Sequence, residues 1–373
     1  MLLLLVHGRR SPARDERVRA LLGASPDWMA LLRQAEVHGV LPLVAHHLEQ
    51  LGDLHLPQDV AALFQRQASL HAGRSLLLAR ELRDVLEQLM AAGIPVIPLK
   101  GVALAHALYG RCTLRVSGDI DILVRRAQVP DAVSVLEAKG YRAEGPWRRW
   151  SRAAYHIEIP LLPRGAGRRW ALDLHWGLVG GEPRYRRAAE ECWEAARIAS
   201  VVGVEAWAMS PEWELLFLAL HAARSQWQGL KWLVDIQQIC WTWRLDWQIV
   251  WAMAHRWGWG EILQLTLEAC RRLWELPPTG GPGSIAWPSW IPRYPDPPRQ
   301  TRWSGFRVMC RLLPGWRQQI AYALRLVGTP SPSDYRWFPL PAFLSPLYLF
   351  LRPFRWAVMA VRGRLDKIGP QVS

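Results

Sequence analysis

Residues 111–124 read RCTLRVSGDIDILV, and two aspartates, Asp119 and Asp121, lie there within an aliphatic run that otherwise resembles a buried strand. Aliphatic side chains favour burial, whereas ionised carboxylates need water, a cation or a metal ion. Because successive side chains of a strand point to opposite faces, the two aspartates share one face and the aliphatic residues the other. The pattern predicts a strand over 119–124 with one acidic face.

Two carboxylates on one face repel each other unless a cation lies between them, and hard oxygen ligands favour Mg²⁺. A second alternating stretch, WALDLHW at 170–176, places Asp173 and His175 on one face of a further predicted strand. A third carboxylate from a neighbouring strand would complete a two-metal site suited to phosphoryl or nucleotidyl transfer. Asp173 is the predicted third acid, and Glu158, in a predicted strand over 155–160, is its competitor.

The chain around these strands predicts an α+β protein with a small mixed β-sheet and helices packed on one side of it. Hydrophobic spacing predicts strands over 94–101, 119–124, 155–160 and 170–176, and helices over 102–110 and 129–141. We expect five parts: a helical leader (1–93), the mixed core (94–208), a helical follow-on domain (209–276), a Pro/Gly-rich linker (277–298) and a basic, apolar C-terminal region (299–373).

Composition describes a globular protein with anionic partners. Hydrophobic residues make up 50% of the 373 residues, which excludes long disorder, and the formal net charge is +14. Such a charge favours binding to nucleotide, nucleic acid or an anionic membrane surface. The five cysteines are far apart and lack CxxC spacing, which argues against a disulfide framework or a zinc site and predicts a cytoplasmic location.

No apolar run is long enough to predict a transmembrane segment. The N-terminal MLLLLV is short, and the apolar stretch 338–354 is broken by four prolines and an arginine. Peripheral contact with an anionic membrane through the basic C-terminal region is the remaining membrane hypothesis.

The run IPVIPLKGVALAHALYGRCTLRVSGDIDILV (94–124), followed by LDLHW (172–176), resembles the uncharacterised nucleotidyltransferase family of the DNA polymerase beta-like superfamily. DWMALLRQAEVHGVLPLVAHHL (27–48) is similar to the helical preamble of that family, and LALHAARSQWQGLKWLVDIQQI (218–239) to its helical follow-on. The resemblance covers roughly residues 25 to 260.

The resemblance implies an enzyme, a nucleotidyltransferase of the EC 2.7.7 type, that transfers NMP from an NTP to an acceptor and releases pyrophosphate. Two Mg²⁺ ions, or Mn²⁺ in their place, would be held by the paired acids Asp119 and Asp121 and by the third strand acid Asp173. Which NTP is used, and whether the acceptor is a small molecule, peptide, protein or tRNA, is left open.

The resemblance also assigns nucleotide binding to Lys100, Gly101, Arg115 and Ser117, which would surround the triphosphate. One departure is that the superfamily has Gly followed by Gly or Ser at the strand–helix turn, whereas here Lys100 precedes Gly101 and Val102 follows it. Arg115 has two interpretations, as a phosphate ligand or as an ion-pair partner of the aspartates.

Two alternative functions remain at this point. A toxin-like transferase acting on tRNA would use the same acids together with the arginine-rich stretch 142–187. The other alternative is a catalytically inactive module that binds nucleotide or nucleic acid and retains the fold without the activity. His221 and Asp235, in the predicted follow-on helices, either line the pocket or pack in the core.

Overall fold

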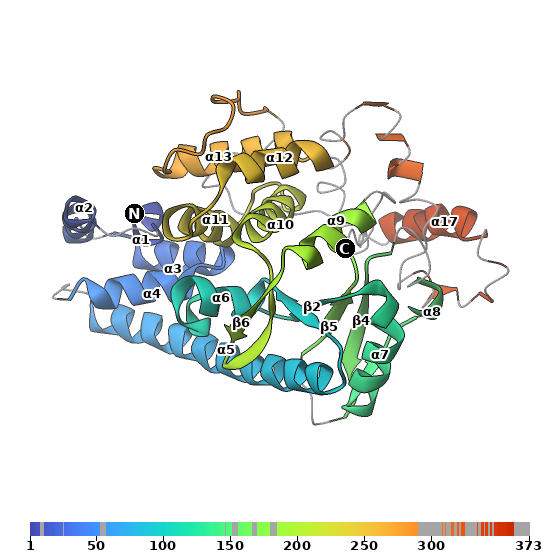
Figure 1. The fold of residues 1–373 in the computed structure, drawn as a ribbon. Helices are drawn as coiled ribbons and strands as arrows, with labels where there is room; N and C mark the ends of the chain where they lie inside the picture. The colour runs from blue at the N-terminus through green and yellow to red at the C-terminus, as the bar shows by residue number, and fades with distance from the viewer. Residues whose placement is uncertain are drawn as a thin grey trace.

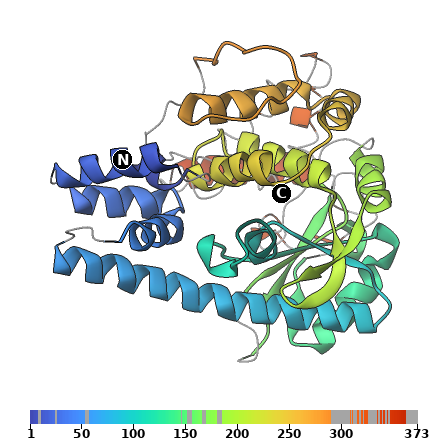
Figure 2. The same ribbon diagram turned by 60° about the vertical axis from the view of Figure 1, so that its left-hand side comes forward.

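A five-stranded sheet lies at the centre of the molecule, with the long helix α5 on one side and a layer of helices on the other (Figures 1 and 2). The computed structural model of the chain describes residues 1–7, 11–24, 26–52, 57–145, 147–150, 156–165, 170–179 and 185–289, scattered positions between 308 and 347, and residues 348–361. These residues form the α+β fold predicted from the sequence, but the prediction that helices pack on one side of the sheet is wrong, because α5 and the follow-on helices cover opposite faces.

The leader is helical, as predicted. It comprises α1 (Leu2–Leu5), α2 (Pro12–Gly23), α3 (Trp28–Val37), α4 (Leu41–Gln50) and α5 (Gln58–Ala91). The side chains of Ser11 and Asp27 accept the free N–H groups at the starts of α2 and α3, which stabilises both helix ends. At 34 residues, α5 is long enough to run beneath the leader and the sheet together (Figure 1).

The central sheet is mixed, in agreement with the prediction. Its strands are β1 (Val96–Leu99), β2 (Ile120–Val124), β3 (Tyr141–Ala143), β4 (Glu158–Pro163) and β5 (Leu172–His175), in the order β1-β2-β5-β4-β3. The pair β2–β5 is parallel and the other pairs are antiparallel. The three-residue strand β3 was not predicted, because it is too short to show alternation.

Short helices and a hairpin surround the sheet. They are α6 (Gly101–Tyr109), the 3₁₀ turns η1 (Cys112–Leu114) and η2 (Arg126–Gln128), α7 (Val129–Ala138), α8 (Trp147–Trp150), α9 (Tyr185–Glu194) and the hairpin β6 (Arg197–Val201) to β7 (Val204–Ala208). The hairpin turns at Val202 and Gly203, which both have positive φ, as a two-residue hairpin loop requires. The hairpin, like β3, was missed in the sequence.

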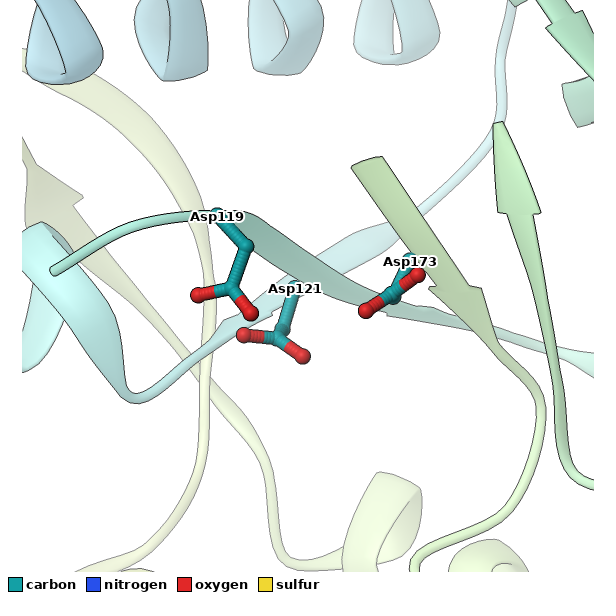
Figure 3. A group of neighbouring side chains, drawn as sticks. All are labelled: Asp119, Asp121 and Asp173. Carbon is teal, nitrogen blue, oxygen red and sulfur yellow. The ribbon is translucent and has the colours of Figure 1, made fainter. Parts of the chain in front are cut away.

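The two faces of the sheet differ in composition, as strand parity predicted. Ile120, Ile122 and Val124 pack with Leu172 and Leu174 in one core cluster, which also contains buried residues of α5 and α7. The opposite face carries the aspartates of β2 and β5 and is turned away from α5 (Figure 3). The acids are therefore directed towards the space under the follow-on helices.

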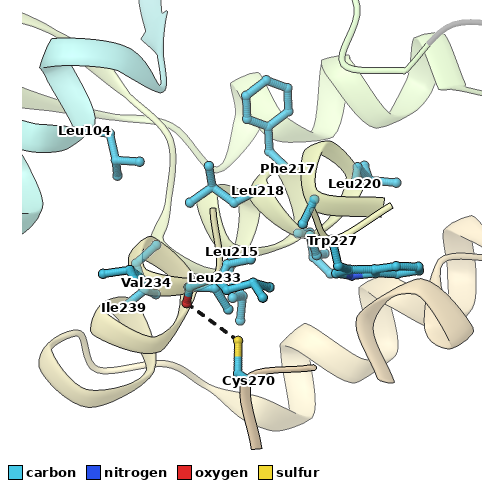
Figure 4. Close-up of a cluster of buried hydrophobic side chains, with 14 of the residues drawn as sticks. Leu104, Leu215, Phe217, Leu218, Leu220, Trp227, Leu233, Val234, Ile239 and Cys270 are labelled. Carbon is cyan, nitrogen blue, oxygen red and sulfur yellow. Dashed lines mark hydrogen bonds between the residues drawn. The ribbon is translucent and has the colours of Figure 1, made fainter. Parts of the chain in front are cut away.

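The follow-on helices are α10 (Pro211–Arg224), α11 (Leu230–Thr242), α12 (Trp247–Trp257) and α13 (Gly260–Leu273). They share one hydrophobic core with α4 and α6 (Figure 4). Within it the fully buried Trp227 donates its indole N–H to Thr266 at 2.8 Å, and the Cys270 thiol lies 3.6 Å from the carbonyl oxygen of Leu233. This common core fixes α10 and α11 over the acidic face of the sheet.

Residues 275–289 form no helix or strand, and the rest of the predicted linker lies outside the described residues. The last helix, α17 (Tyr348–Val361), is unusual because it buries Arg352 and Arg355 against Asp334, at 2.8 Å each, and exposes Phe350 and Phe354. In the part of the chain that the structure describes, no helix combines the length and apolarity needed to cross a membrane. The domain boundaries and the peripheral membrane contact stay predictions.

Candidate active site

Three aspartates converge on the acidic face of the sheet. The parallel register of β2 and β5 places Asp121 beside Asp173, and Asp119 directly precedes β2. One carboxylate oxygen from each of the three lies within 4.8 Å of the others (Figure 3). The same-face arrangement and the convergence expected from strand parity are therefore present.

The donor set fits a hard divalent cation. Ligands of Mg²⁺ lie at about 2.1 Å, so two oxygens on the same ion are separated by up to about 4.2 Å. The oxygens of Asp119, Asp121 and Asp173 lie within 4.8 Å, so small side-chain rotations bring them to this spacing. Carboxylate oxygens without sulfur or several imidazoles suit Mg²⁺ and Mn²⁺.

The crowding of acids shifts their titration in opposite directions. Burial, together with the charges of Glu158, Asp121 and Asp119, raises the pKa of Asp173 to about 7. Burial also disfavours the charged form of Asp121, but the hydrogen bond from His175 and the charge of Lys100 outweigh it and lower the pKa of that carboxyl. Asp121 is therefore ionised in the metal-free protein, while Asp173 is partly protonated near neutral pH.

His175 joins two carboxylates. Its Nε2 lies 3.2 Å from Asp121 Oδ1 and its Nδ1 lies 3.0 Å from Glu158 Oε2. Burial opposes the imidazolium, but Glu158 and Asp121 outweigh it and raise the pKa of His175 to about 10. Glu158, the competing third acid, is therefore engaged by His175, and it is Asp173 that completes the three-acid group.

The strand–helix turn after β1 brings the predicted phosphate-binding residues to the same place. Lys100 and Gly101 both have positive φ, at 44° and 62°, which only glycine adopts freely. The Lys100 Nζ lies 3.1 Å from Asp121 Oδ2. A Cβ on Gly101 would lie 3.9 Å from Ser117 Oγ, so these two residues are neighbours. The strained Lys100 backbone marks the turn as a functional candidate.

Arg115 is bound by a carboxylate other than the predicted aspartates. Its Nε donates to Asp235 Oδ2 of α11 at 2.8 Å, and Tyr109 donates to the other oxygen of Asp235 at 2.7 Å. Arg115 is 3% exposed, and its Nη1 donates to Ser117 Oγ at 3.4 Å. The ion pair with Asp235 ties the core to the follow-on helices, while phosphate contact by Arg115 stays a prediction.

The follow-on helices add further ionisable groups that face this region. His221 of α10 stacks on Trp232 at 5.6 Å, and burial, with the charges of Lys100 and Arg224, holds its pKa well below the usual value. Burial lowers the pKa of Lys231 to about 8 and raises that of Glu214 to about 7. Sequence analysis named His221 but missed Lys231 and Glu214.

The comparisons agree with this geometry at the level of the family. The model of a family described as uncharacterised nucleotidyltransferases matches residues 24–275, which is more than half of the chain. The chain belongs to this family, and its class of activity is nucleotidyl transfer. No curated protein matches the sequence.

Two solved structures are similar to parts of the chain. One is the antibiotic-resistance factor ANT(2'')-Ia, with 15% identity and a TM-score of 0.37 over 49% of this chain and 92% of the other. Another is a nucleotidyltransferase-like antigenic protein from Paracoccidioides brasiliensis, with 16% identity and a TM-score of 0.30 over 52% of this chain and 92% of the other.

Proposed function

We propose that the protein transfers a nucleoside monophosphate from an NTP to an acceptor hydroxyl, amine or phosphate and releases pyrophosphate, with Asp119, Asp121 and Asp173 as the metal-binding acids. The observation that carries the proposal is the convergence of these three carboxylates, with one oxygen from each within 4.8 Å, in a chain of the nucleotidyltransferase family. Neighbouring strands supply the acids, so the rigid sheet sets their spacing.

Each residue has a defined task in this proposal. Asp119 and Asp121 would hold both divalent ions, and Asp173 would hold the ion on the acceptor side. Bound Mg²⁺ or Mn²⁺ would supply Lewis acidity to the attacking oxygen and to the triphosphate. The carboxylate of Asp173 would also assist removal of the acceptor's proton.

The nucleotide would lie against the turn at Lys100 and Gly101 and beside Ser117. The first N–H groups of α6 are free to receive phosphate oxygens, because a helix start leaves its amides without intrahelical partners. Lys100 neutralises Asp121 at 3.1 Å, so the lysine and the metal ions would share the charge of this carboxylate.

The experiment that tests the proposal is a search for label transfer. Each of the four NTPs, labelled at the α-phosphate, is incubated with Mg²⁺ and with acceptor pools that include small molecules, peptides, tRNA and the protein itself. We expect one NTP and one pool to give labelled product, and Asp119→Asn to give none at unchanged fold. No transfer from any NTP to any pool in Mg²⁺ or Mn²⁺ contradicts the proposal.

The tRNA-directed alternative has partial support from the surface. Five arginines of the 142–187 stretch are exposed, namely Arg142, Arg148, Arg164, Arg186 and Arg187, and Arg152, Arg168, Arg169 and Arg184 lie outside the described residues. Salt-sensitive tRNA binding followed by label transfer would select tRNA as the acceptor. Absence of Mg²⁺-dependent NTP binding in calorimetry would select the inactive module. A cytoplasmic location also stays a prediction.

A further inference from the structure

Both basic residues that the sequence assigns to phosphate are already bound by carboxylates. Lys100 lies 3.1 Å from Asp121, and Arg115 lies 2.8 Å from Asp235. Lys231, in the first turn of α11, differs from them, because it has no carboxylate within ion-pair distance among the described residues. Its ammonium lies over the ring of Trp232, 4.5 Å from the centroid.

The surrounding structure holds the Lys231 side chain in place. Its backbone N–H donates to the carbonyl oxygen of His38 at 3.2 Å, in the turn between α3 and α4. In the same turn, a Cβ added to Gly39 would lie only 3.1 Å from Lys231 Cδ, so the glycine makes room for the lysine stem. Burial, reinforced by the charge of Arg115, lowers the pKa of Lys231 to about 8. Ordering an unpaired ammonium in this way costs free energy unless an anion binds to it.

Arg115 adds a second unused donor beside the same indole. Its Cζ lies 5.1 Å from the Trp232 centroid, and its Nη2 is buried with no hydrogen-bond partner among the described residues. Two cations therefore share one ring, while Asp235 pairs with only one of them. Lys231 has no ion-pair partner among the described residues and Arg115 keeps one unsatisfied N–H, a combination suited to a multivalent oxyanion.

We propose that Lys231 and the Nη2 group of Arg115 form a phosphate-binding seat between α11 and the segment before β2. Lys231 is near enough to Asp119 for their charges to interact, so the seat adjoins the acid triad. The identification of the ligand as the polyphosphate of the NTP rests on the proposed function, whereas the seat itself depends only on these contacts. A phosphate-bearing acceptor is the other source of the same chemistry.

The direct test is calorimetric titration with inorganic tripolyphosphate in the absence of divalent metal. Lys231→Met, which keeps much of the stem, should weaken binding about tenfold or more, the loss typical of a charged hydrogen bond. Lys231→Arg should retain binding. Lys139→Met is the matched control, because Lys139 is exposed at the end of α7 and its loss removes the same charge. Equal binding by the wild type and by a folded Lys231→Met variant overturns the seat.

Labelling of the wild-type chain gives a second measurement that needs no variant. The chain has only four lysines, Lys100, Lys139, Lys231 and Lys367, so acetylation by an amine-reactive ester can be mapped at every site. Tripolyphosphate should protect Lys231 and leave Lys139 unchanged. Equal labelling of Lys231 with and without tripolyphosphate also overturns the seat.

Further measurements distinguish the nucleotide from a phosphate-bearing acceptor as the ligand, and test the phosphate-binding seat independently of the proposed function. Parallel losses of tripolyphosphate and Mg²⁺-ATP affinity in Lys231→Met identify the nucleotide as the source, whereas loss of tripolyphosphate affinity alone identifies a phosphate-bearing acceptor. Asp119→Asn should keep metal-free tripolyphosphate binding although it abolishes transfer. Lys231-dependent binding in a wild-type chain that transfers no nucleotide would refute the proposed function and support the seat.

Discussion

Two polar clusters lie between the sheet and the follow-on helices, and they differ in charge balance. In the acid cluster, four carboxylates, those of Asp119, Asp121, Asp173 and Glu158, meet two cationic side chains, Lys100 and His175. In the second cluster, Arg115 and Asp235 pair one to one at 2.8 Å and are 3% and 1% exposed. The Arg115–Asp235 pair is buried, whereas Asp119 and Asp173 of the acid cluster are partly exposed.

The contrast separates a structural role from a functional one. The buried Arg115–Asp235 pair balances its charges and joins the core to α11. A cluster with an excess of carboxylates is left with a destabilising repulsion, which shows in the pKa of about 7 at Asp173 after burial and neighbouring charges raise it. Repulsion of this kind is relieved by a divalent cation, so the acid cluster is the candidate metal site.

The largest expected effect follows from removing a charge from the unbalanced cluster. Asp119→Asn should lower kcat/KM about 10³-fold or more, because metal binding supplies several kcal/mol of transition-state stabilisation. Asp119 is partly exposed and forms no ion pair within the described residues, so the urea midpoint should not fall. Activity within tenfold of the wild type would show that Asp119 is not needed for catalysis and would contradict a functional role of the acid cluster.

Disrupting the Arg115–Asp235 pair should lower the stability of the fold, in contrast to the effect of Asp119→Asn. Asp235→Asn leaves Arg115 as an uncompensated buried charge and should lower the free energy of unfolding by about 3–5 kcal/mol in urea denaturation. Asp131→Asn, at an exposed position in the first turn of α7, is the control and should change stability by a few tenths of a kcal/mol. Equal stability of the Asp235 and Asp131 variants would show that the ion pair does not hold α11 in place.

An intermediate effect is expected for the group that orients Asp121 through His175. Glu158→Gln removes the charge 3.0 Å from His175 Nδ1 and should weaken Mn²⁺ affinity about 10–100-fold, as loss of a supporting partner does at other metal sites. Glu190→Gln, exposed on α9, is the matched control. Unchanged Mn²⁺ affinity in calorimetry would confine Glu158 to a structural role.

The smallest effect concerns pH. The pKa of Asp173 rises from an ordinary 3.8 to about 7 through burial and its acidic neighbours, so its contribution to metal-free stability is present below pH 4 and is lost as pH rises through 7. Metal binding requires the carboxylate, so the Mg²⁺-induced rise in Tm should be a few degrees larger at pH 8 than at pH 6.

Two variants test whether Asp173 causes this pH dependence. Asp173→Asn should remove it. Glu214→Gln should preserve it, because Glu214 lies outside the acid cluster. Glu214 is a suitable control, since burial raises its pKa to about 7 as well. A Mg²⁺ effect on Tm that is the same at pH 6 and pH 8 would contradict the assignment of Asp173.

Local sequence was sufficient for the acidic face because strand parity is a short-range property. The alternation around Asp119 and Asp121, and around Asp173, determined which side chains share a face, and the parallel register of β2 and β5 then brought the acids together. Metal binding by these acids stays a prediction, and spacing alone indicated which side chains share a face but not that Asp173, rather than Glu158, would be the third acid.

The partner of Arg115 was not available from the sequence, because it depends on contacts between distant segments. Asp235 is 120 residues away, and nothing near Arg115 indicates whether it pairs with the strand aspartates or with α11. Lys231 was missed for the same reason. A weak signal existed, since a lysine in an apolar helix is unusual in a chain with only four lysines.

The central claim is tested most directly by following which phosphorus atom reaches the acceptor. The wild-type protein and Asp119→Asn are each incubated with Mg²⁺, acceptor and the preferred NTP, labelled at either the α- or the γ-phosphate. The account predicts α-label in the acceptor and γ-label in pyrophosphate with the wild type, and neither with the variant. Label from the γ-phosphate in the acceptor, or equal α-label transfer by Asp119→Asn, would contradict it.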